Sequence, residues 1–127
     1  MKLDYSTDSG KSFDAAVAAV EAEAAAHGFR VLYVHDVTAT LAGKGFVREP
    51  YKIIEICQAG TAHEALQKDN LVGLMMPCKI NVFTDAGQTR ISALRPALIA
   101  TFFPGVGLED LAAQVDRDVI AIVDAAR

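Results

Sequence analysis

Residues 50–83, PYKIIEICQAGTAHEALQKDNLVGLMMPCKINVF, decide the fold of this 127-residue chain. They start with an apolar, strand-like run at residues 51–57, continue with a short helical pattern at residues 61–69, and return to a strand at residue 78. Cys57 ends the first run and Cys78 begins the next one. The stretch therefore places two thiols on either side of one short helix, and it specifies a fold more firmly than a function.

Alternating apolar residues and turn signals predict the other strands. In the second of them, the alternation puts Val31, Tyr33 and His35 on one face and Leu32 and Val34 on the other. The last two strands form a hairpin with its turn at residues 85–87. Besides residues 51–57, the expected strands are residues 1–7, 29–37, 78–84 and 88–94.

Three helices are predicted from the spacing of apolar residues. The first runs to about residue 27, with Ser12 as its N-cap and Gly28 as its stop. The second covers residues 61–69 and turns Ala62, Ala65 and Leu66 inward. The third covers residues 108–126, with an apolar stripe of Leu108, Leu111, Val115, Val119 and Ile122. Residues 1–127 are thus expected to form one α+β domain, a mostly antiparallel sheet with amphipathic helices packed on one face.

The composition excludes several classes of protein. Hydrophobic residues make up 52% of the chain, which disfavours disorder. The net charge is -4 and no stretch concentrates Lys and Arg, so we expect neither a nucleic acid nor a membrane surface as partner. The first residues lack the apolar core of a secretion signal, and no apolar run is long enough to span a bilayer. We therefore expect a cytoplasmic protein with reduced thiols.

Three segments carry a resemblance to a known family: GKSFDAAVAAVEAEAAAHGFRVLYVHDV at residues 10–37, PYKIIEICQAGTAHEALQ at residues 50–67 and VGLMMPCKINVF at residues 72–83. From about residue 9 to the final helix, the chain resembles the bacterial and archaeal domain of unknown function 302. The resemblance implies a compact α+β fold, related in shape to the TATA-binding-protein half-repeat, and a homodimer. It implies no DNA binding and supplies no catalytic residues.

The two cysteines are the first candidates for chemistry. If their strands are neighbours, Cys57 and Cys78 with His63 form a soft three-ligand set for zinc or cuprous copper. Close thiols can alternatively form a reversible disulfide, or one of them can act as a nucleophile. Both can equally be small buried hydrophobic residues. Glu55 shares the expected face of Cys57, and a neighbouring carboxylate opposes thiolate formation.

The methionines supply a second candidate site. Met75 and Met76 stand in an apolar turn before Cys78, and such adaptable side chains suit the wall of a ligand pocket. An ordinary core or a dimer contact explains them equally well. The apolar segment at residues 96–106 exceeds what two helices are expected to cover, which favours a homodimer.

Three functions remain open at this point. The first is a dimeric binding or sensing module that holds an apolar ligand, a haem-like group or a metal near Met75 and Met76. The second is a small thiol-dependent enzyme or redox protein that uses Cys57 or Cys78. The third is a structural or partner-binding dimer. The leading hypothesis is the first, because the sequence shows no acid–base or nucleophile constellation.

Overall fold

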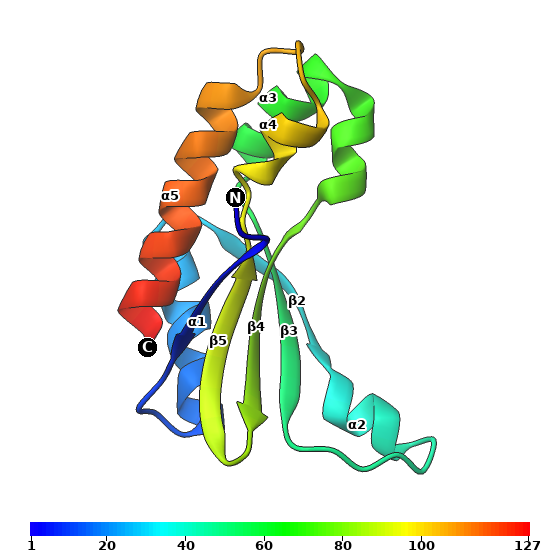
Figure 1. Ribbon diagram of the computed structural model, residues 1–127, viewed down its shortest axis with the longest axis vertical. Helices are drawn as coiled ribbons and strands as arrows, with labels where there is room; N and C mark the ends of the chain where they lie inside the picture. Colours follow the sequence, from blue (N-terminus) through cyan, green and yellow to red (C-terminus); the bar gives the residue numbers. More distant parts are fainter.

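The computed structural model describes residues 1–127 as a five-stranded sheet with helices (Figure 1). Every neighbouring pair of strands is antiparallel, and the strand order is β1-β5-β4-β3-β2. This arrangement confirms the α+β class. The strands are β1 (Asp4–Asp8), β2 (Arg30–Asp36), β3 (Tyr51–Cys57), β4 (Cys78–Asp85) and β5 (Gln88–Leu94).

Two long helices, α1 (Phe13–Ala26) and α5 (Glu109–Ala126), cover one face of the sheet (Figure 1). We call the sheet with these two helices the body. A short helix, α2 (Val37–Ala42), lies beside β3 at the far end of the sheet. The remaining short helices gather beyond the opposite end of the sheet, and we call them the cap: α3 (Ala59–Lys68), the 3-10 helix η1 (Asn70–Met75) and α4 (Leu98–Phe102).

The body core forms where the predicted apolar stripes meet the sheet. Helix α1 begins as expected, because the Ser12 side chain accepts a hydrogen bond of 3.2 Å from the Ala15 N–H. It ends before Gly28, whose φ of +81° is a conformation that favours glycine. Val115, Val119 and Ile122 of α5 are buried, and each contributes about 1.5–3 kcal/mol to stability.

The hairpin between β4 and β5 is confirmed. Its turn residues, Ala86 and Gly87, have φ of 49° and 79°, the backbone that tight two-residue hairpins need. The Glu49 carboxylate accepts a hydrogen bond of 3.0 Å from each of their N–H groups. The segment that precedes β3 is thus held against the turn.

Strand β2 corrects the simple alternation predicted for it. A β-bulge lies between Val31 and Tyr33, so that Leu32 has no partner in β3. Beyond an inserted residue the inward and outward positions of a strand change places. Val34 therefore faces the helices opposite Ile54, and His35 faces the open side of the sheet opposite Ile53.

Several boundaries also differ from the prediction. Helix α3 starts two residues earlier than expected, β1 starts at Asp4, and Leu66 is 38% exposed instead of buried. Helices α2, η1 and α4 were not predicted, because each has at most six residues and therefore shows little periodicity. None of the helices combines the length and the apolar character that crossing a bilayer requires.

The cap has a small core of its own, which corrects the interpretation of residues 96–106 as surplus apolar surface. Ala65, Val72 and Leu108 are buried at its centre. Ile99 and Phe103 pack against them, and only Phe102 of this segment is a large, strongly exposed hydrophobic residue, at 64%. The segment therefore builds the cap.

Candidate functional site

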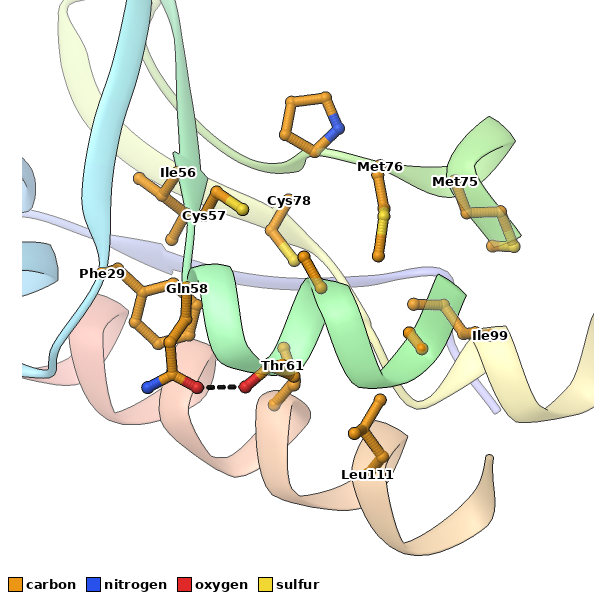
Figure 2. Close-up of a pocket in the computed structure, with 14 residues that line it drawn as sticks. Phe29, Ile56, Cys57, Gln58, Thr61, Met75, Met76, Cys78, Ile99 and Leu111 are labelled. Atoms are coloured by element: carbon orange, nitrogen blue, oxygen red, sulfur yellow. Dashed lines mark hydrogen bonds between the residues drawn. The ribbon is translucent and has the colours of Figure 1, made fainter. Parts of the chain in front are cut away.

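A cavity of about 50 Å³ lies where the cap meets the body, and 11 of its 14 lining residues are hydrophobic (Figure 2). Its walls come from six elements, α3 among them. The ends of β3 and β4 supply Ile56, Cys57 and Cys78, and the end of η1 supplies the two methionines. Ile99 of α4 and Leu111 of α5 complete the far side. The cavity thus separates the body core from the cap core.

Helix α3 explains why a space remains here. The residues it turns toward the cavity include Ala62 and Ala65, whose side chains are too short to reach the opposite wall. Large side chains approach from the other sides, and small side chains facing large ones at a junction of two cores leave room that neither core fills.

One end of the cavity is polar. Gln58 precedes α3 and Thr61 lies in its first turn, and the Thr61 hydroxyl donates a hydrogen bond to the Gln58 side-chain oxygen (Figure 2). No Asp, Glu, Lys, Arg or His lines the cavity. The site therefore suits neutral groups, since an unpaired charge placed here would lose its hydration without compensation.

The structure brings Cys57 and Cys78 to the same cavity. Cys78 pairs with Ile56 across β3 and β4, which makes Cys57 the next residue along the neighbouring strand. Both cysteines are free and half-buried. Burial, and to a lesser extent the neighbouring Cys57, raises the pKa of the Cys78 thiol from 9.0 to about 11. At neutral pH Cys78 is a neutral thiol and therefore a weak nucleophile.

The other predicted site residues divide into two groups. Met75 and Met76 line the cavity, as the pocket hypothesis requires. His63 is exposed on α3 and does not line it. Accordingly, no three His, Cys, Asp or Glu side chains are grouped to hold a metal ion. Glu55 lies 3.3 Å from the His35 ring on the open face of the sheet.

A partly buried ion pair lies beside this cavity, where the chain passes from β5 of the body into the cap. Arg95, just after β5, donates to both carboxylate oxygens of Asp116 in α5 at 3.0 and 2.7 Å. Asp116 also accepts a hydrogen bond of 3.1 Å from the Ala97 N–H, at the start of α4. Burial alone would raise the pKa of Asp116, but these hydrogen bonds and the charge of Arg95 hold it below 3.8.

Sequence reasoning missed the polar end and the far wall of the cavity. Gln58 was not considered because it precedes the predicted helix, although its spacing to Thr61 and Ala62 places the three on one helical face. Ile99 was treated as part of a surface segment. The spacing that identifies Gln58 can be read from the sequence. The packing of α4, which brings Ile99 to the cavity, cannot.

The comparisons with known proteins agree with one another. A solved structure described as an uncharacterized conserved protein DUF302 from Bacillus stearothermophilus superposes with a TM-score of 0.94. It is 27% identical in sequence, and the alignment covers 100% of both chains. No curated protein is similar to this chain. The model of the family described as domain of unknown function DUF302 matches residues 5–126, and the chain therefore belongs to this family.

Proposed function

We propose that this protein is a small dimeric binding module that holds a neutral, apolar ligand in the cavity between cap and body. The observation that carries the proposal is the lining itself, whose only polar side chains are Gln58 and Thr61 and which is closed on one side by Met75 and Met76. Methionine side chains adapt to ligands of different shape. Because the ligand would touch both cores, its binding would stabilise the cap against the body and give the module a means of sensing.

The size and chemistry of the cavity select among the ligands predicted earlier. Its volume of about 50 Å³ compares with about 150 Å³ for an apolar protein cavity that binds benzene. A haem-like group is far too large for it, and the donor set for a metal is not assembled. A compact hydrocarbon or a small neutral molecule with one hydrogen-bonding group fits best, with Met75 and Met76 moving aside as needed.

The three methionines of the chain make a direct test possible. With each ε-methyl group labelled with 13C, benzene is titrated into the protein as the probe. Met75 and Met76 line the cavity, so we expect both signals to shift and to saturate. Met1 is 78% exposed, and its methyl signal serves as an internal control that should not shift. Equal small shifts of all three signals would show solvent effects only and would refute the proposal.

A filled cavity provides the matched variant. Ala62→Leu places three additional carbons in the space, so the saturable shifts of Met75 and Met76 should disappear. Ala22→Leu makes the same change on the exposed surface of α1 and should leave the titration unchanged. Thermal unfolding checks that both variants are folded. In the wild type, benzene at 100 times its Kd should add about 2.7 kcal/mol of stability, which Ala62→Leu should lose.

The dimer is proposed from the apolar side chains on the outside of the cap. Leu71, Leu74 and Phe102 are 60%, 82% and 64% exposed, and exposed apolar groups of this size often mark an interface. Light scattering at micromolar concentration should give twice the chain mass. Leu74→Glu should shift the protein toward the monomer, while Ala125→Glu, on the exposed side of α5, should not. A monomer mass for the wild type would contradict the dimer.

A redox role of the thiol pair is the second candidate, favoured by the position of Cys57 one residue beyond the partner of Cys78. In the cytoplasm, where we propose that the protein works, both cysteines would rest as thiols. Mild oxidant should then remove two free thiols within one chain, by taking up the two hydrogens lost as the disulfide forms, and should not join two chains. Two titratable thiols after that treatment, or a cross-link between chains, would eliminate this role.

A further inference from the structure

The open face of the sheet, which α1 and α5 leave uncovered, has a groove of about 300 Å³. Helix α2 forms one wall of it. Val37, Leu41 and Ile53 provide its apolar lining, and His35, Glu55 and Lys79 provide its charged or ionisable groups. The groove and the cavity between cap and body have no lining residue in common.

The bulge in β2 creates the chemistry of this groove. Without the inserted residue, His35 would point toward the helices; with it, His35 faces the open side beside Glu55 of β3. The ring Nε2 atom of His35 lies 3.3 Å from a Glu55 carboxylate oxygen. Bulges commonly re-aim a side chain next to a functional site. This pair is also the acid–base combination that the sequence did not reveal, since the two residues lie 20 positions apart.

Two features of the groove remain unsatisfied within the protein. Of the two ring nitrogens of His35, Nε2 lies next to Glu55, and Nδ1 has no hydrogen-bond partner within the protein. Lys79 lies opposite Glu55 in the strand register, is exposed and forms no ion pair. The groove therefore presents one unpaired cation and one oriented imidazole above an apolar lining.

We propose that this groove binds a small organic acid. The carboxylate of the ligand pairs with the Lys79 ammonium, and its apolar body rests on Ile53, Val37 and Leu41. The free Nδ1 of His35 exchanges a hydrogen bond with the ligand, while Glu55 fixes the plane of the ring. The inference stands independently of the ligand proposed for the cavity, because the two sites differ in residues and in charge.

The three histidines report on this site. With 13C-labelled imidazole rings, benzoate is titrated as the probe and benzamide, its uncharged counterpart, as the control. We expect benzoate to shift the His35 signals saturably, and benzamide to bind at least about tenfold more weakly because it lacks the charge. His27 and His63 do not line the groove and should stay unchanged.

A matched pair of variants assigns the effect to Lys79. Lys79→Gln should weaken benzoate binding about tenfold or more, and Lys68→Gln, the same charge change on α3, should leave it unchanged. Glu55→Gln removes the carboxylate beside the His35 ring. The NMR chemical shifts of the two ring nitrogens of His35, which depend on the tautomer, should therefore change even without ligand. Absence of a saturable His35 shift, equal shifts with benzamide, or equal losses in both lysine variants would overturn the proposal.

Discussion

The cavity between cap and body and the groove on the open sheet face are built from the same two strands, yet they have opposite chemistry. Cys57 and Cys78 border the cavity at the ends of β3 and β4. Glu55, two residues before Cys57, and Lys79, next to Cys78, pair with each other across the two strands and border the groove. The cavity is lined almost wholly by hydrophobic residues, whereas the groove contains the His35–Glu55 pair and a lysine without an ion-pair partner.

The comparison shows how the layers of the fold determine chemistry. Where the cap covers the strand ends, burial keeps Cys78 neutral, with its pKa raised to about 11. Where no helix covers the sheet, charged side chains keep their hydration and remain available to a ligand. We therefore expect a neutral ligand in the cavity and a charged ligand in the groove. Substitutions that change charge should likewise cost more stability in the cavity than in the groove.

The largest difference should follow from placing the same charge in each site. Val115, in the cavity wall and the body core, is 7% exposed. An aspartate there is buried without a partner, which costs several kcal/mol out of a total of about 5–15, so Val115→Asp should give insoluble or unfolded protein. Ile53→Asp, on the half-exposed groove lining, should cost only about 1–2 kcal/mol. Similar chemical denaturation curves for the two variants would contradict the contrast.

The next largest effect should come from the ion pair that joins cap and body. Arg95→Ala leaves the buried carboxylate of Asp116 without its main partner, and we expect a loss of about 3 kcal/mol in urea unfolding. Asp116 has a lowered pKa in the folded state, so the stability it contributes is present above its ordinary pKa of 3.8 and is lost as the pH falls below that value. Arg117→Ala removes a surface hydrogen bond to Gln114 and only the smallest of the electrostatic influences on Asp116, so it should change little and provides the control.

The thiol of Cys78 should make stability fall at alkaline pH. Because its pKa is raised in the folded state, its contribution is intact below about pH 9 and is lost as the pH rises toward 11. A shift from 9.0 to about 11 corresponds to about 2–3 kcal/mol. Unfolding measured from pH 8 to 11 should show this decline in the wild type and a flatter profile in Cys78→Ala. An unchanged slope in that variant would show that Cys78 is not the group responsible.

The smallest effect on stability should be that of the His35–Glu55 pair in the groove. The side chains of His35 and Glu55 are 46% and 22% exposed, and pairs of this kind contribute less than about 1 kcal/mol. Glu55→Gln should therefore leave the unfolding midpoint nearly unchanged while it alters the nitrogen shifts of His35. A loss comparable to that of Arg95→Ala would indicate that the pair supports the fold and not a ligand site.

The sequence predicted those features that depend on local periodicity. The strand at residues 51–57, the hairpin turn and the stripe on α5 follow directly from alternation, turn residues and helical spacing. The two cysteines of the cavity were identified because they flank a single short helix, and the two methionines because they stand in the apolar turn before Cys78. His63 was included for its position in the first turn of that helix, its spacing to Gln67 and Asn70 favoured solvent exposure, and in the structure it is exposed.

The groove was beyond sequence reasoning because it depends on one inserted residue. Nothing in the run from Arg30 to Asp36 marks Leu32 as the unpaired position, and without that knowledge His35 is assigned to the wrong face. The partner Glu55 becomes apparent only once β2 and β3 are paired in register. The short helices of the cap could not be predicted from the sequence either, since their stability comes from packing and not from intrinsic helix propensity.

One titration tests the central claim that the two sites are separate and of opposite chemistry. A single sample labelled at the methionine methyl groups and the histidine rings is saturated with benzene and then titrated with benzoate. We predict that benzene shifts Met75 and Met76 only, that benzoate shifts His35 only, and that the benzoate Kd is the same with and without benzene. Signals that respond to both ligands, competition between the ligands, or no saturable response at either site would contradict this account.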